Sequence, residues 1–264
     1  MRISLHKFYH AIISSQAWVA FCFALFCKYF QLIHDWQNDT LIFISFFATL
    51  SVYNFAHWRS DKLRWRLIIS VVSILICFYL GFKFLKFNLL ISLSLLAIIS
   101  IFYSWSFLKN NLRNIPYLKI FLIALVWSFA AILPVFIDFT LLNWYIIFLW
   151  ISLFCYVIAI TIPFDIRDVL VDKLSLKTLP QRFGIRKSVF LGYFLILVSA
   201  VFYEIYFSFS EHNWDMSFSI SLVVVIIFLS LTKPFRSRYF TAFWLEGVSA
   251  LPFLLYWILK YLNF

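Results

Sequence analysis

The chain has 264 residues, of which 64% are hydrophobic and only 12% are Asp, Glu, Lys or Arg, and its formal net charge is +11. Soluble domains carry about 25% charged residues, so this composition excludes a water-soluble enzyme, a disordered chain and a coiled-coil rod. A transmembrane barrel is disfavoured because its strands alternate apolar with polar residues, whereas the apolar runs here are continuous. The composition therefore predicts an all-α protein whose solvent is mostly lipid.

Long apolar segments follow one another along the whole chain, each close to the roughly 20 residues that a membrane-spanning helix needs. The first segment follows a basic N-terminus, but it is too long for a signal peptide and lacks a small-residue cleavage site. Because no Pro/Gly/Ser-rich linker interrupts the chain, we expect a single intramembrane domain over residues 1–264. The nine predicted helices cover 11–33, 41–57, 67–87, 89–108, 118–137, 143–164, 189–209, 217–233 and 241–262.

The basic residues predict the orientation of this bundle. With the N-terminus in the cytoplasm, the cytoplasmic segments hold 18 of the 22 Lys and Arg residues. Such a positive-inside bias indicates an integral membrane protein, which we place in a bacterial inner membrane with the N-terminus and the polar loops in the cytoplasm. It also accounts for the net charge without nucleic acid, which is not an expected partner. The same cations are available to an anionic substrate or to anionic lipids.

Three aspartates mark the end of the sixth predicted helix. Asp165, Asp168 and Asp172 have the spacing i, i+3 and i+7, which places them within roughly 60° of one another on a helix. Carboxylates on one stripe repel one another unless a positive charge lies between them. Oxygen ligands without His or Cys favour Mg²⁺ or Ca²⁺. The alternative is a solvated helix end at the membrane surface.

A second polar stretch ends the second predicted helix on the same side. Asn54, His57 and Asp61 repeat the i, i+3 and i+7 spacing, and a basic run follows in both stretches. Asn54 and Asp61 are candidate metal ligands, and His57 is a candidate proton acceptor or phosphate donor because its ordinary pKa lies near neutrality. The alternatives are a polar contact between helices for Asn54 and a hydrogen-bonded surface histidine for His57.

Cations from neighbouring loops complete the predicted site. Lys109, Arg113, Lys119 and Lys177 are candidates for holding diphosphate oxygens through charge-assisted hydrogen bonds. For each of them singly, ordinary positive-inside charge is the favoured interpretation, and the case for a site rests on their convergence. A metal that bridges the oxygens, together with Lys and Arg, is the combination that a diphosphate site needs. Aromatic residues, 23% of the chain, would supply ring faces that stabilise a carbocation.

The stretch FDIRDVLVDKLSLKTLPQRFG, residues 164–184, resembles the second Asp-rich motif of the UbiA superfamily of intramembrane prenyltransferases, and its menaquinone-type branch in particular. The resemblance places Asp168 and Asp172 at the metal-binding aspartates, Asp165 at a neighbouring Asn/Asp position, and Lys177 with Thr178 at a Lys-Thr pair. It implies a UbiA-like bundle of nine helices. The implied activity is Mg²⁺-dependent transfer of a prenyl group from an isoprenyl diphosphate to an aromatic or lipid acceptor.

The first motif of the family, Asn-Asp-x-x-Asp-x-x-x-Asp, is only partly present. YNFAHWRSDK, residues 53–62, keeps Asn54 and Asp61 but has Phe55, His57 and Trp58 where acids are expected. We therefore predict an intramembrane prenyltransferase, with a second hypothesis that the chain binds an isoprenoid or quinone without turnover. A transporter is a third, weaker hypothesis, because the acidic clusters lie at helix ends and not at the bilayer midplane. The sequence does not identify the lipophilic acceptor.

Overall fold

The structure is a computed structural model, and it describes residues 11–36, 38–104, 118–134, 143–170, 177–210, 212, 214–237 and 239–262, without the side chains of 101–104. Within these ranges every regular element is a helix. The elements are α2 (Ala17–Ile33), α3 (Asp39–Asp61), α4 (Arg64–Phe84), α5 (Phe87–Ser104), α6 (Leu118–Ile132), α7 (Ile146–Asp168), α8 (Leu179–Phe183), α9 (Ile185–Phe209), α10 (Met216–Ser230), the π-helix η5 (Phe240–Leu245), α11 (Glu246–Val248) and α12 (Leu251–Tyr261).

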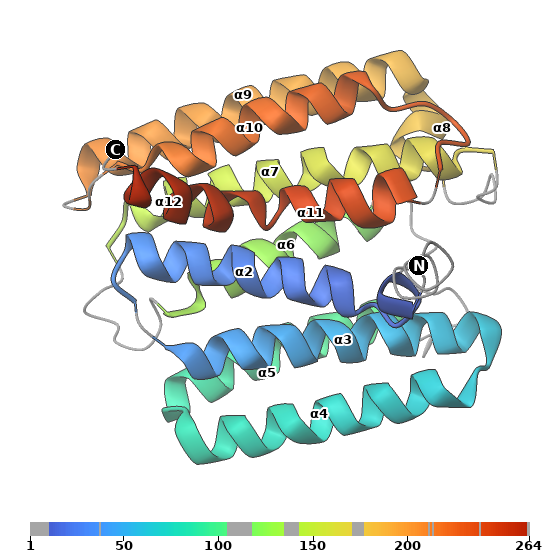
Figure 1. Cartoon of the computed structure of the whole chain (residues 1–264), viewed down its shortest axis with the longest axis vertical. Coiled ribbons are helices and arrows are strands. Elements are labelled where there is room, and N and C mark those ends of the chain that lie inside the picture. The colour runs from blue at the N-terminus through green and yellow to red at the C-terminus, as the bar shows by residue number, and fades with distance from the viewer. Residues whose placement is uncertain are drawn as a thin grey trace.

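The helices run side by side along one direction, with α3, α4 and α5 on one flank and α9 and α10 on the other (Figure 1). α7 lies between them and packs against α6, α9 and α10. Most of the apolar stretch of α7 is buried inside the protein, whereas most of that of α4 is not. The outer face of α4 carries exposed apolar side chains, among them Ile68, Leu75, Phe78 and Phe82, as expected for a helix that faces lipid.

Serine pairs join neighbouring helices where small side chains let the backbones approach. The hydroxyl of Ser51 in α3 donates to the carbonyl of Ser70 in α4 at 2.9 Å. The hydroxyl of Ser152 in α7 donates in the same way to the carbonyl of Ser199 in α9 at 2.8 Å. Each pair satisfies buried polar groups inside an otherwise apolar contact, which fixes how the two helices sit against each other.

Four of the described helices are long and apolar enough to cross a membrane: α3, α4, α7 and α9. Residues Phe240–Val248 and Leu251–Tyr261 form a fifth candidate if they are one span with a 48° bend. The other predicted segments correspond to the shorter apolar helices α2, α5, α6 and α10. The all-α class is thus confirmed, and several apolar helices indicate an integral membrane protein. The count of nine spans and the single domain over 1–264 stay predictions.

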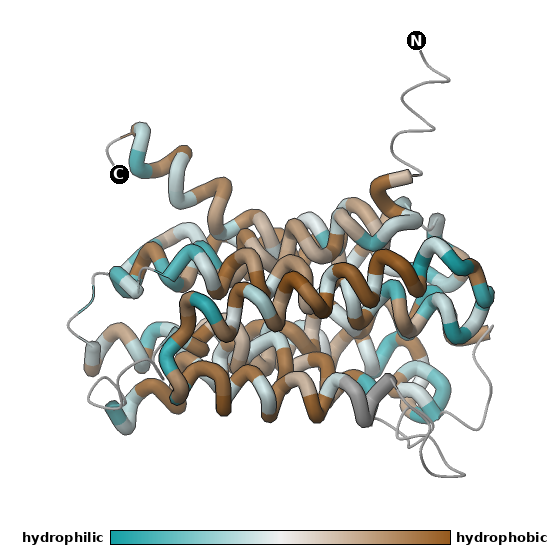
Figure 2. The backbone as a smooth tube through the Cα atoms, turned by 90° about the horizontal axis from the view of Figure 1, so that it is seen from below, coloured by the Kyte–Doolittle hydropathy of each residue, from teal (hydrophilic) through white to brown (hydrophobic). Residues whose placement is uncertain are grey.

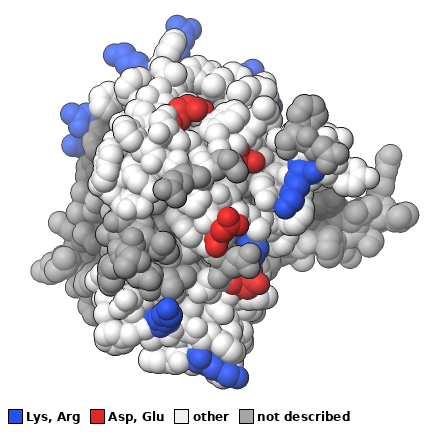
Figure 3. All heavy atoms as spheres, turned by 90° about the vertical axis from the view of Figure 1, so that its left-hand side faces the viewer, with Lys and Arg blue, Asp and Glu red and all other residues white. Residues whose placement is uncertain are grey.

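Polar residues collect at the two ends of the bundle and apolar residues fill its middle (Figure 2). α3 and α7 reach Asp61 and Asp168, each four residues past the predicted end, because the helical backbone continues beyond the apolar run. Asp61, Asp165 and Asp168 therefore lie on helices and not in loops. The opposite end of the bundle shows acidic groups around its middle, with most Lys and Arg at the rim (Figure 3).

Candidate functional site

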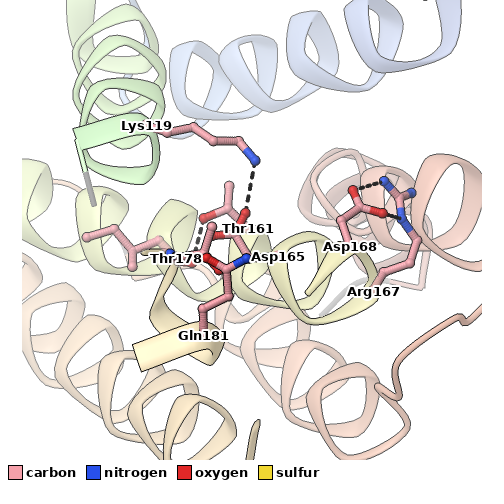
Figure 4. Close-up of polar contacts among 8 residues, drawn as sticks. Lys119, Thr161, Asp165, Arg167, Asp168, Thr178 and Gln181 are labelled. Atoms are coloured by element: carbon pink, nitrogen blue, oxygen red, sulfur yellow. Dashed lines mark hydrogen bonds and ion pairs between the residues drawn. The ribbon is translucent and has the colours of Figure 1, made fainter. Parts of the chain in front are cut away.

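Asp165 lies buried at the end of α7, with only 2% of its surface exposed. Lys119, in the first turn of α6, places its Nζ atom 2.9 Å from Oδ1 of this carboxylate. Thr178 and Gln181, from the start of α8, lie near the same carboxylate (Figure 4). A buried carboxylate without a cation would cost several kcal/mol, of order 3–5. Lys119 therefore neutralises Asp165 and joins α6 to α7.

Asp168 is paired with the residue that precedes it. Nε and Nη2 of Arg167 donate to the two carboxylate oxygens of Asp168 at 2.6 and 2.5 Å, a bidentate arrangement. The remaining nitrogen, Nη1, donates to the hydroxyl of Thr241 in η5 at 2.5 Å. The backbone N–H of Phe235 donates to the carbonyl of Arg167 at 3.4 Å. Arg167 thus ties the end of α7 to the segment that enters η5.

The two described aspartates of α7 turn to different partners, Asp165 to Lys119 and Asp168 to Arg167 (Figure 4). The third predicted ligand, Asp172, lies outside the described residues. Within the described part of the chain, no three Asp, Glu, His or Cys side chains come together as a metal site. The repulsion expected between the carboxylates is here relieved by protein cations, one for each carboxylate.

Asn54 is fully buried in α3. Its Nδ2 donates to the carbonyls of Ser15, at 2.8 Å, and of Leu50, at 2.9 Å. Its Oδ1 is buried and makes no hydrogen bond to the described residues. A buried amide oxygen without a donor is costly, of order 1–3 kcal/mol, so this oxygen is available to a ligand N–H or O–H group or to a cation.

Asp61 ends α3 and binds the start of α4. Its Oδ2 lies 2.7 Å from Nε of Arg66, and its Oδ1 accepts a hydrogen bond from the N–H of Leu63 at 3.0 Å. Arg66 also donates through Nη1 to the carbonyl of Ser14 at 2.8 Å. His57, one turn earlier, is partly buried and interacts electrostatically with Asp61.

The two predicted motifs lie at the same end of the bundle, where α3 and α7 finish (Figure 1). The contacts described for Asn54 and Asp61 lead to α3 itself, to α4 and to the segment before α2. Asp165 contacts α6, and Asp168 contacts Arg167 of α7, which in turn reaches η5. In these contacts the motifs form two separate polar clusters. Their predicted union around one metal stays a prediction.

The predicted cations have different positions. Lys119 is in the ion pair with Asp165, and Lys177 is exposed just before α8, with a positive φ of 43°. Lys109 and Arg113 lie outside the described residues. Several polar residues of the site were not predicted, among them Arg66, Arg167, Gln181 and Thr241. Arg167 was counted only as a topological charge, although it stands next to Asp168, and Thr241 carries no local signal because it comes from a distant segment.

The donor chemistry of the site fits a hard divalent cation. Asp165, Asp168 and Asn54 offer only oxygen ligands, which Mg²⁺ prefers. A metal on α7 would have to compete with Lys119 and Arg167 for the carboxylates. Together, the fold and the site define a multi-pass α-helical membrane protein with a buried, charge-compensated acidic cluster at one end of its bundle.

The sequence matches no family model, and it matches no curated protein. Solved structures are similar to it. A UbiA homolog from Archaeoglobus fulgidus bound to GPP and Mg²⁺ has a TM-score of 0.64 and 14% identity, and the match covers 94% of this chain and 98% of the other. The homolog bound to DMAPP and Mg²⁺ gives a TM-score of 0.64, 14% identity and coverages of 94% and 97%. A third structure of a UbiA homolog from this organism has a TM-score of 0.56, 12% identity and coverages of 95% and 98%. The chain therefore shares its fold with these UbiA homologs.

Proposed function

We propose that this protein transfers a prenyl group from an isoprenyl diphosphate to a lipophilic acceptor inside the membrane, in a reaction that requires Mg²⁺. The observation that carries the proposal is the acidic motif at the end of α7 in a chain with the UbiA fold. Two structures with this fold and nearly the same length are bound to GPP or DMAPP together with Mg²⁺. The buried Lys119–Asp165 pair adds a cation beside a carboxylate at that end.

In this scheme Asp165, Asp168 and Asp172 hold Mg²⁺, and Asn54 and Asp61 form a weaker second half. When bound there, Mg²⁺ would supply charge neutralisation that makes the diphosphate a better leaving group. Lys119 exchanges its contact with Asp165 for a diphosphate oxygen. Lys109, Arg113 and Lys177 take the remaining negative charge, and His57 accepts a proton or donates to a phosphate. We place this site on the cytoplasmic face of a bacterial inner membrane.

The test is transfer of radiolabelled geranyl diphosphate to lipid-extractable product in membranes that contain the protein. Transfer should depend on Mg²⁺ and stop with EDTA. Asp168→Asn and Asp172→Asn should each lower the rate by at least about a hundredfold, as expected when a charged group that stabilises the leaving group is lost. Asp35→Asn, at the opposite end of the bundle, is the matched control. Full transfer by Asp168→Asn or Asp172→Asn would refute the mechanism.

A second candidate function, binding of an isoprenoid or quinone without turnover, is favoured by one observation. The described polar groups are largely satisfied by the protein itself: Asp168 by Arg167, Asp61 by Arg66 and the Asn54 amide by Ser15. Saturable binding of geranyl diphosphate, with no product across a panel of phenolic, quinol and lipid-alcohol acceptors, would support this candidate against the first.

A further inference from the structure

Glu246 is an acidic residue inside the last, broken apolar segment of the chain. It follows the π-helix η5 directly and precedes the bend of 48° between Phe240–Val248 and Leu251–Tyr261. Ionisable residues within membrane segments are costly, and their default interpretation is a functional site. π-helical turns also occur frequently at functional sites. None of the roles described above uses this carboxyl group.

The π-helix sets the direction of Glu246. The backbone N–H of Glu246 donates to two carbonyls, that of Phe243 and that of Thr241, which lies five residues earlier in the chain. A five-residue turn brings residue i+5 back over residue i, whereas an α-helix would rotate it away. Glu246 therefore lies over Thr241, whose hydroxyl accepts a hydrogen bond from Nη1 of Arg167. Both residues share the face of the helix that looks toward the end of α7.

Three contacts hold this segment in place. The indole N–H of Trp18 in α2 donates to the carbonyl of Phe243 at 2.8 Å, and the two rings stack with centroids 4.5 Å apart. The hydroxyl of Tyr156 in α7 donates to the carbonyl of Val248 at 3.3 Å. α2 and α7 thus fix both sides of Glu246, and Figure 1 shows α11 lying against α2.

No cation contacts the Glu246 carboxyl group in the described part of the chain, where this group takes part in no ion pair within 4.0 Å. Arg167 and Cys22 are its electrostatic neighbours. Arg167 already gives three of its N–H groups to Asp168 and Thr241. Glu246 keeps a small part of its surface exposed, although protein surrounds most of its carboxyl group.

We propose that Glu246 anchors the hydroxyl group of a lipophilic acceptor, an inference that rests on the prenyl-transfer function proposed above. A carboxyl oxygen on this face accepts a hydrogen bond from an O–H donor and disfavours the same molecule with its oxygen methylated, because the buried oxygen is then left without a donor. Tyr156, whose hydroxyl reaches the carbonyl of Val248, stacks on Phe26 with centroids 5.5 Å apart, so the protein beside this segment is aromatic and apolar and suits a lipophilic molecule. Acceptor and diphosphate would then be held from two sides of Arg167.

The binding test uses the whole protein in nanodiscs with 4-nonylphenol and 4-nonylanisole, in which a methyl group replaces the hydroxyl hydrogen and removes the O–H donor. Saturating 4-nonylphenol should raise the melting temperature of the wild type more than 4-nonylanisole does, and bind about tenfold more tightly. Glu246→Ala should remove this difference. Glu204→Gln, an exposed acid of α9, should keep it. Equal responses to the two probes in the wild type, or an unchanged difference in Glu246→Ala, would overturn the proposal.

Glu246→Gln provides a second variant that preserves the shape of the side chain. If transfer is observed, this variant should raise KM for a phenolic acceptor about tenfold and leave KM for geranyl diphosphate unchanged. A similar loss for both substrates would indicate a structural role and overturn the proposal. Because the nanodisc assay needs no turnover, a missing transfer activity would reject the proposed function without deciding the role of Glu246. Equal binding of the two probes would reject the role of Glu246 without deciding whether the protein transfers a prenyl group.

Discussion

Nζ of Lys119 lies 2.9 Å from Oδ1 of the buried Asp165, and this pair joins α6 to α7 at the end of the bundle where α7 finishes. The carboxylate side chain is 3% exposed and the ammonium side chain 30%. Removing only the cation leaves a buried charge uncompensated. We therefore expect Lys119→Met to lower the free energy of unfolding by about 3 kcal/mol, measured by thermal or denaturant unfolding in detergent micelles.

Two further variants separate charge from side-chain size in this pair. Lys187→Met removes an exposed lysine of α9 and should change stability by less than about 0.5 kcal/mol. Asp165→Asn combined with Lys119→Met should recover part of the loss, because the amide carries no charge. A Lys119→Met protein as stable as Lys187→Met would contradict the role of this ion pair.

Arg167 holds three acceptor atoms at once, both carboxylate oxygens of Asp168 and the hydroxyl of Thr241. Lysine has a point charge and cannot reproduce this fork. Arg167→Lys should therefore destabilise the protein by about 1–3 kcal/mol and loosen η5 from α7, which faster proteolysis near residues 233–239 would report. Arg186→Lys, at an exposed position of α9, is the control. Equal stability of the two variants would exclude a bridging role for Arg167.

Gly192 of α9 packs closely against the side chain of Leu229 in α10. A Cβ atom at this position would lie 2.8 Å from Cδ2 and 3.0 Å from Cδ1 of Leu229. The leucine end can shift to admit one methyl group, so Gly192→Ala should cost little. Gly192→Leu should cost about 1–3 kcal/mol through overpacking, measured as a lower melting temperature. Leu229→Ala should rescue Gly192→Leu in part, and failure to do so would contradict this contact.

Hydrophobic runs predict where the helices lie because roughly 20 apolar residues in sequence can only be satisfied by a helix in lipid. That argument locates the helices over 143–164 and 189–209, which correspond to α7 and α9, but it misses the internal structure of 241–262. Here the sequence is largely apolar, and the π-turn over Phe240–Leu245 depends on partners from elsewhere, such as Trp18 on the carbonyl of Phe243. Apolar composition carries no information about such a change in hydrogen-bond register.

The candidate site could be predicted in its residue types but not in its pairings. The i, i+3 spacing places Asp165 and Asp168 on neighbouring positions of a helix, and both do lie on α7. Which cation each carboxylate meets is decided by the packing of α6 and η5 against α7. Lys119 is 46 residues from Asp165, and Thr241 is 74 residues from Arg167. Spacing within one helix does not encode these distances along the chain.

His34 lies at the end of the bundle opposite to the acidic motif, and its burial predicts that the stability of the protein depends on pH. It is 2% exposed, its ring stacks on Trp36 with centroids 4.2 Å apart, and its Nδ1–H donates to the carbonyl of Phe30 at 2.8 Å. Burial, with a smaller effect of nearby His212, lowers the pKa of His34 from 6.5 to about 3. The folded state therefore keeps this ring neutral where the unfolded chain binds a proton.

The resulting stability is complete above pH 6.5 and is lost progressively as the pH falls toward 3, because protons then favour the unfolded chain. Between pH 7.5 and 5.0 we expect the wild type to lose about 2 kcal/mol through this group. His34→Phe, which suits the aromatic surroundings, should lose correspondingly less over the same range, and His212→Phe should retain most of the wild-type loss. Melting temperatures at the two pH values measure the effect, and parallel losses in the wild type and His34→Phe would show that His34 is not its source.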